Sequence, residues 1–263
     1  MHPRRLPQLV AATVLAGAGA LAQPVEGSAG APIFVHYQER PPYSETRADG
    51  VVQGLVATPT AFAFERAGIA FRWMLTPSQR QLALIQNGSA THCGVGWFRN
   101  PAREALGKFS RPLYRDQPLA ALVRVGAGWP AGMSFEDALA SPKLRLLVKD
   151  GYSFGVRVDA LIATRAARKV TTSGEPAQLV NMLLADRADW MLMAPEEAEG
   201  ILRQDQGHAN QLRLQALNDM QAGLERHLYC SPAVADGVMA RLNAALPPLS
   251  PPPQTGRASG VRP

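Results

Sequence analysis

From residue 31 onward the chain alternates short apolar runs with longer stretches in which apolar residues recur at helical spacing. Three apolar runs have the length of buried strands: 33–37, 69–74 and 91–97. Thr-Pro pairs at 58–59 and 76–77 supply the cap and first-turn proline typical of helix starts. Gly68 and Gly88 are placed to end these helices. This order of elements predicts a parallel sheet covered by helices.

The same alternation starts again after Pro118. Its apolar runs of strand length are 119–123, 144–148 and 190–193. Ser134, with Asp137 three residues later, resembles a capping box, and Pro176 stands at the start of a further helix. We therefore predict a second α/β unit.

The last predicted elements are a strand at 227–230 and a helix that starts at Ser231-Pro232 and stops at Pro247-Pro248. The segment 249–263 is rich in Pro, Gly and Ser. Such a composition cannot bury a core, so we predict a disordered tail there.

The first residues have the pattern of a signal peptide. Arg4 and Arg5 precede an apolar run at 9–22, which ends in the small residue Ala22. The run is shorter than the roughly 20 apolar residues of a membrane-spanning helix. We predict that 1–22 is a cleavable signal peptide and that the mature chain is a soluble periplasmic or secreted monomer.

Charge argues against a nucleic-acid partner. The chain has 27 basic and 21 acidic residues, a net charge of +6, and loss of Arg4 and Arg5 leaves 25 against 21, or +4. Arg257 and Arg262 lie in the predicted tail, so the folded body is closer to neutral. No run of Lys and Arg interleaved with aromatics is present.

Sequence motifs of catalysis are missing as well. The chain has no His-Glu-x-x-His, no Gly-x-Ser-x-Gly and no phosphate loop, so we predict no enzyme and no cofactor. His36, His92 and His227 are potential metal ligands together with the two cysteines. His92 and Cys93 are adjacent and point to opposite faces of a strand, so we expect these residues to pack in the core without a metal.

Several short motifs, in this order and spacing, make the chain resemble a known family. They are Ile33-Phe34-Val35, Pro41-Pro42-Tyr43, Gly54-Leu55, Asn87-Gly88, Asn100-Pro101-Ala102-Arg103 and Phe109-Ser110-Arg111-Pro112-Leu113-Tyr114. Over residues 31–246 the chain is similar to the extracellular solute-binding proteins of family three, the amino-acid-type receptors of ABC importers.

The resemblance implies a fold and a mode of action. The expected fold is α/β and two-lobed, like type II periplasmic binding proteins, with two parallel or mixed sheets, flanking helices and a two-segment hinge. Lobe one would comprise 31–117 and 227–248, and lobe two 118–226. A small molecule would be captured between the lobes by hinge closure and delivered to an ABC permease.

The resemblance also points to Arg103 as the group that grips a ligand carboxylate. Its planar guanidinium suits a two-point contact with an anion. The alternative is a solvated arginine at a helix start. Asn100 stands where the family more often has Thr and keeps a hydrogen-bonding side chain.

In lobe two, Gly151-Tyr152-Ser153 matches a small-residue turn at a helix N-terminus, where backbone N–H groups favour an anion. Ser153 is equally well interpreted as an ordinary helix cap. Tyr152 is bulkier than the usual residue and is expected to narrow the cleft.

The loop that follows the first strand leaves it at its carboxyl end, where open α/β sheets place ligands. Glu39 and Tyr43 lie in this loop, and Tyr43 and Trp97 are candidates for apolar walls of a pocket. Both aromatics are alternatively core residues.

Ala194 departs from the family pattern, which commonly has an Asp there to hold the ligand's ammonium. An ammonium buried without a counter-charge is costly. Either Glu39, Asp150 or Glu196 takes this role, or the ligand is not an ordinary α-amino acid. The ligand stays unassigned.

Three further questions stay open. The family's sheet order would bring the strands of Cys93 and Cys230 together, so either a disulfide or two free thiols is expected. Alternatively, the closed lobes dock on a membrane sensor protein and not on an importer. A less favoured reading is an enzyme similar to cyclohexadienyl dehydratase, with Arg103 on the substrate and Glu39 as acid or base.

Overall fold

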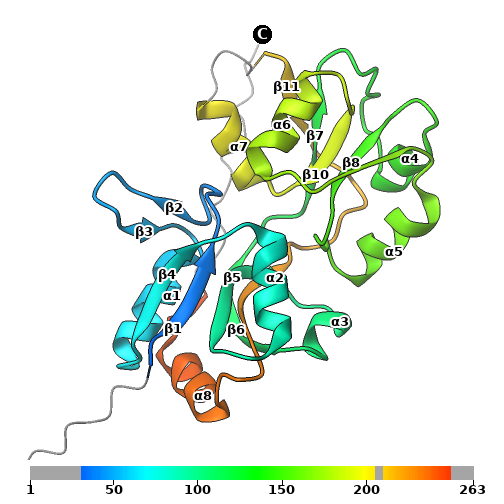
Figure 1. Ribbon diagram of the computed structural model, residues 1–263. Coiled ribbons are helices and arrows are strands. Elements are labelled where there is room, and N and C mark those ends of the chain that lie inside the picture. Colours follow the sequence, from blue (N-terminus) through cyan, green and yellow to red (C-terminus); the bar gives the residue numbers. More distant parts are fainter. Residues whose placement is uncertain (1–30, 205–209, 250–263) are drawn as a thin grey trace, which may run out of the picture.

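The computed structural model describes residues 31–204 and 210–249. The predicted signal peptide lies outside these residues, as does the predicted tail from residue 250 onward. Within them the chain forms two α/β lobes, and Figure 1 shows one above the other with two segments of chain crossing between them.

Lobe one is built on a five-stranded sheet of order β4-β1-β5-β12-β6. Its strands are β1 (Ile33–Tyr37), β4 (Phe71–Leu75), β5 (His92–Phe98), β6 (Lys108–Arg115) and β12 (Glu225–Cys230). Its helices are α1 (Ala57–Arg66), α2 (Ser78–Asn87), α3 (Pro101–Glu104) and α8 (Asp236–Ala245). A short ribbon of β2 (Glu45–Thr46) and β3 (Val52–Gln53) follows β1.

Lobe two has a second five-stranded sheet of order β11-β7-β10-β8-β9. Its strands are β7 (Ala120–Arg124), β8 (Leu146–Lys149), β9 (Lys169–Thr172), β10 (Trp190–Met193) and β11 (Leu212–Gln215). Its helices are α4 (Phe135–Ala140), α5 (Val156–Arg165), α6 (Pro176–Leu184) and α7 (Pro195–Gln204). All four residues of β10 are buried, as expected of a strand covered on both faces.

Both sheets are mixed, and the prediction of parallel strands holds only for part of each. β1 is parallel to β4 and β5, and β8 is parallel to β9 and β10. The strand that enters each lobe from a crossing runs the other way. β7 is antiparallel to β10 and β11, and β12 is antiparallel to β5 and β6.

Most predicted element positions agree with the structure, but three helix starts were wrong. α1 begins at Ala57, because Thr58 Oγ1 accepts a bond from Gly54 N and does not cap the helix. α2 begins at Ser78 without a cap from Thr76, whose hydroxyl bonds His36 Nδ1 at 2.8 Å. α8 begins only at Asp236.

The predicted helix ends at Gly88 and Ser134 are confirmed, and α6 begins at Pro176 as predicted. Gly88 caps α2 in the left-handed conformation, with φ at 69°, which favours glycine. Ser134 caps α4, and its hydroxyl accepts a hydrogen bond from Asp137 N at 3.0 Å. Local signals therefore mark both ends, and at α4 the distant Asp219 adds a tertiary cap by accepting bonds from Phe135 N and Glu136 N.

The two crossing segments lie against each other between the lobes. Asp116 N donates to Leu224 O at 2.9 Å. A Cβ on Gly223 would lie 1.5 Å from Asp116 O, so only glycine allows this close approach. The Arg226 guanidinium binds both carboxylate oxygens of Asp116, each at 2.7 Å, and both side chains are buried.

Lobe one is also joined covalently. Cys93 of β5 and Cys230 of β12 are direct partners across antiparallel strands, and the structure places them in a disulfide. The described residues include no helix long and apolar enough to cross a membrane.

Candidate functional site

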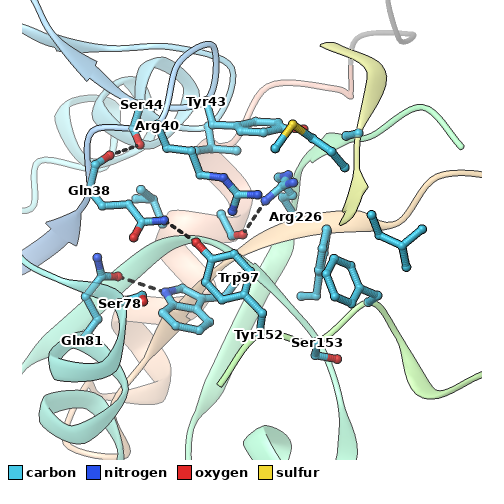
Figure 2. Close-up of a pocket in the computed structure, with 18 of the residues that line it drawn as sticks. Gln38, Arg40, Tyr43, Ser44, Ser78, Gln81, Trp97, Tyr152, Ser153 and Arg226 are labelled. Atoms are coloured by element: carbon cyan, nitrogen blue, oxygen red, sulfur yellow. Dashed lines mark hydrogen bonds between the residues drawn. The ribbon is translucent and has the colours of Figure 1, made fainter. Parts of the chain in front are cut away.

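A cavity of about 60 Å³ lies between the lobes, at the carboxyl ends of β1 and β5. Lobe one contributes Gln38, Arg40, Tyr43, Ser78, Trp97 and Arg103 to its lining, among others. Lobe two contributes Tyr152, Ser153, Phe154, Leu192, Met193 and Ala194. Figure 2 shows side chains from both lobes converging on this space.

Arg103 reaches the cavity from the short helix α3. Asn100 caps this helix by accepting a bond from Arg103 N at 2.9 Å, which fixes the start of the arginine side chain. Arg103 is 6% exposed, and its guanidinium donates to Phe98 O at 2.7 Å and to Gly151 O at 2.8 Å. It also lies 4.7 Å from the centre of the Trp97 ring.

No carboxylate among residues 31–204 and 210–249 pairs with Arg103. Burial lowers the pKa of its guanidinium, although an arginine remains charged at any physiological pH. A buried cation that contacts only carbonyl oxygens and a ring is suited to receive an anion.

Trp97 forms a flat wall beside this cation. Its indole Nε1 donates to Gln81 Oε1 at 3.2 Å, which fixes the plane of the ring. A Cβ on Gly94 would lie 2.4 Å from Nε1, so a glycine is required behind the ring. The ring is therefore held by the bond to Gln81 and by the close approach of Gly94.

Tyr152 extends from lobe two across the cleft to lobe one. Its hydroxyl accepts a bond from Gln38 Nε2 at 2.7 Å, drawn as a dashed line in Figure 2. Its ring lies 5.1 Å from the Arg40 guanidinium and 5.2 Å from Lys149 Nζ. Burial raises the pKa of Tyr152, so the hydroxyl is neutral.

A second contact between the lobes is an ion pair. Arg40 Nε and Nη2 donate to the two carboxylate oxygens of Glu197 at 2.6 and 2.8 Å. Glu197 lies at the start of α7 and its side chain is 2% exposed. The Arg40 guanidinium also faces the Tyr43 ring at 5.3 Å.

Arg226 closes the cavity on the hinge side. Its guanidinium carbon lies 3.7 Å from the centre of the Tyr43 ring and 4.5 Å from that of Phe98. Because Asp116 binds it at two points, this cation is neutralised within the hinge.

Comparison with known proteins gives a fold and no sequence match. No family model and no curated protein matches the chain. Among solved structures, an ancestral arginine-binding protein bound to arginine is similar at a TM-score of 0.64 and 16% identity, over 82% of this chain and 90% of that one. Holo ArgBP from T. maritima gives 0.65 and 13%, over 82% and 88%. The fold is that of a two-lobed periplasmic binding protein.

A sensor domain shares this periplasmic-binding-protein fold. A histidine kinase sensor domain with similarity to periplasmic binding proteins matches with a TM-score of 0.64 and 19% identity, over 82% of this chain and 88% of that one. The similar solved structures named here are binding proteins and a sensor domain.

Most of the predicted site residues lie at the cavity or beside it. Those that line the cavity are Arg103, Trp97, Tyr43, Tyr152 and Ser153. Asn100 and Gly151 line an open groove beside it, which shares Arg103 and Tyr152 with the cavity.

The acidic residues predicted near the ligand lie elsewhere. Glu39 is exposed and accepts bonds from Thr46 N and Oγ1, which draws its carboxylate toward β2. Asp150 accepts a bond from Gln79, and Glu196 accepts one from Gln117 N at 3.2 Å. None of the three lines the cavity.

The turn before α5 presents little to an anion. Phe154 N and the Ser153 hydroxyl both donate to the carboxylate of Asp159, which therefore occupies the helix N-terminus. Gly151 presents its carbonyl oxygen to Arg103. Gly155 N donates to Ser153 Oγ at 3.3 Å, so the polar groups of this turn find their partners within the protein.

Sequence reasoning missed several residues of the site, among them the polar lining residues Gln38, Arg40, Ser78 and Arg226, and Glu197, which pairs with Arg40. Gln38 and Arg40 stand in the loop that was singled out for its position after the first strand. Arg226 and Glu197 find their partners at 110 and 157 residues' separation, which no local pattern encodes.

Proposed function

We propose that this protein is an exported solute-binding protein, which captures a small carboxylate-bearing ligand between its two lobes. The observation that carries this proposal is the Arg103 guanidinium: it is buried at the cleft, and the described part of the chain offers it no carboxylate. A charge-assisted contact gains strength where water is excluded.

The same arginine supports a hinge-closure mechanism. Arg103 belongs to lobe one and donates to Gly151 O of lobe two, so an anion bound there lies at the junction of the lobes. The ligand meets lobe one first, and lobe two then closes over it. Closure is favoured only by as much as the ligand binds the closed form better than the open one.

The first candidate partner is an ABC importer, to which the protein would deliver its ligand. The order of family-three motifs from Ile33 to Tyr114 supports this role, as does the similarity of the fold to the substrate-binding protein of an amino acid ABC transporter. The signal-peptide pattern at 1–22 supports a periplasmic location.

A membrane sensor is the second candidate partner, because a histidine kinase sensor domain has the same fold. Uptake of labelled ligand by cells with and without the gene separates the two roles. An importer component is required for uptake, whereas a sensor partner changes gene expression and leaves uptake unaltered.

The test of the proposal is ligand-induced thermal stabilisation, because a ligand that binds the native state raises its melting temperature. Mature protein is screened against organic acids and amino acids, and denatured extracts are analysed by mass spectrometry for a retained ligand. We expect Arg103→Ala to abolish the shift. The matched control is Arg72→Ala, which removes an exposed arginine of β4.

Unchanged affinity in Arg103→Ala would exclude this site assignment. Absence of any small-molecule ligand would contradict the binding role itself. Release of a chemically altered ligand would favour the enzyme alternative.

A further inference from the structure

Three guanidinium groups line the cavity, but only one is available to a ligand. Arg40 is bound at two points by Glu197, and Arg226 is bound at two points by Asp116. Arg103 has no such partner among the residues described. Arg103 is therefore the one guanidinium of the cavity that no described carboxylate pairs with, and it matches one ligand carboxylate.

The cavity offers nothing charged to an ammonium group. No acidic side chain is among the described residues that line it. Both oxygens of Glu197 and of Asp116 are taken by guanidinium N–H groups. An ammonium enclosed beside Arg103 would lose its water without gaining a counter-charge, which is strongly unfavourable.

Neutral hydrogen-bonding groups are available in its place. Gln38 Oε1, Ser78 Oγ and Tyr43 OH are buried, line the cavity and have no hydrogen-bond partner within the described chain. The amide nitrogen of Gln38 donates to Tyr152, and its carbonyl oxygen, which can only accept, is left without a donor. A hydroxyl group on the ligand supplies that donor and can accept from Ser78 or Tyr43.

Size restricts the ligand further. The cavity is small, with a volume of about 60 Å³. Tyr152 fills the space next to it and is held there by Gln38 and Arg40. The remaining wall is apolar, with Leu192 and Met193 from lobe two.

We propose that the ligand is a short hydroxycarboxylate without an ammonium group. Its carboxylate pairs with Arg103, and its carbon chain packs on Leu192 and Met193. Its hydroxyl donates to Gln38 Oε1 and accepts from Ser78 Oγ or Tyr43 OH. This assignment rests on the proposed function and names the ligand class of the same site.

Matched pairs of ligands test the proposal by calorimetry. Lactate is compared with alanine, and 3-hydroxybutyrate with 3-aminobutyrate, so that each pair differs only in hydroxyl against ammonium. We expect at least one hydroxy acid to bind about tenfold more tightly than its amino partner, or better, because a buried unpaired charge costs more than a neutral hydrogen bond. Amino-acid affinity within tenfold in both pairs overturns the proposal.

Ser78→Ala tests the hydroxyl contact by a ratio of affinities. We expect the preference for lactate over propionate to fall roughly threefold to tenfold, the value of one neutral hydrogen bond. The control Ser89→Ala, at an exposed position outside the cleft, should keep the ratio. A ratio unchanged in Ser78→Ala and in Tyr43→Phe contradicts the hydroxyl contact.

Different results would contradict the solute-binding role and the hydroxycarboxylate assignment. If amino acids bind and Arg103→Ala abolishes their binding, the solute-binding role stands and the hydroxycarboxylate assignment falls. If neither acids nor amino acids bind, both fall.

Discussion

Arg40 and Glu197 lie on different lobes and form a two-point ion pair, with contacts of 2.6 and 2.8 Å. Glu197 is almost completely buried, whereas the Arg40 side chain is 18% exposed. Because the pair joins the two lobes, it favours the closed arrangement, and the ligand needs to supply only part of the free energy of closure.

This pair gives a first prediction. Arg40→Leu leaves a carboxylate buried alone and should lower the free energy of unfolding by about 3–5 kcal/mol. The double variant Arg40→Leu/Glu197→Leu should cost less than the sum of the single variants, because both charges leave together. Urea denaturation measures the cycle, and small-angle scattering should show a larger radius of gyration in the double variant.

The exposed pair Arg47–Asp49, with side chains 54% and 51% exposed, provides the control. Arg47→Leu should change the free energy of unfolding by less than about 0.5 kcal/mol. A double variant as compact as the wild type would show that the pair does not hold the lobes together.

The crossing segments give a second prediction. Gly223→Ala would place a Cβ 1.5 Å from Asp116 O and 2.7 Å from Gln117 O, and both are backbone atoms that cannot turn aside. We expect a loss of about 3 kcal/mol in unfolding free energy, or failure to fold. Gly237→Ala in α8 meets nothing within 4 Å and should raise stability by about 0.5 kcal/mol. Equal stabilities would disprove the close approach.

Tyr152 should set the upper limit of ligand size. Tyr152→Ala removes the ring that bridges to Gln38 and Arg40, so larger hydroxy acids should gain affinity relative to lactate. Tyr152→Phe keeps the ring and should keep the size limit. Calorimetry with lactate and 3-phenyllactate measures the ratio, and an unaltered ratio in Tyr152→Ala would count against this role.

His36 should make stability depend on pH. Burial, with the neighbouring His92 and Arg80, lowers the pKa of His36 to about 4, against about 6.5 in the unfolded chain. Between these pH values the unfolded state binds more protons than the folded state. The contribution of neutral His36 to the free energy of unfolding is therefore fully present above about pH 6.5 and is lost as the pH falls toward 4.

We expect the wild type to lose about 2 kcal/mol more than His36→Gln between pH 7 and pH 5. Thr76→Val removes the hydrogen bond to His36 Nδ1 but keeps the titrating ring, so its pH dependence should resemble the wild type. Urea denaturation at pH 7 and at pH 5 measures the free energy of unfolding of the wild type and of each variant. Identical slopes in wild type and His36→Gln would rule out His36 as the source.

The sequence predicts much of the fold because local signals and burial agree. The strands at 33–37 and 190–193 begin and end where their apolar runs do. β6 was not predicted as a strand, since Arg111 and Pro112 interrupt its apolar pattern. β9 and β11 were missed as well, because these edge strands are half exposed and carry polar residues.

The site is less predictable because its contacts join residues that are far apart in the sequence. Arg103 and Tyr152 stand in short motifs that can be recognised locally. The pairing that neutralises Arg40 and Arg226 depends on how the lobes and the hinge meet. Which arginine is free for a ligand therefore follows only from the three-dimensional structure.

The disulfide between Cys93 and Cys230 spans 137 residues of sequence, and all of lobe two lies within that span. Lobe two is thus part of a closed covalent ring whose two ends are fastened in the sheet of lobe one. A single protease cut inside lobe two would leave one molecule of unchanged mass apart from an added water. The severed halves would separate only after reduction.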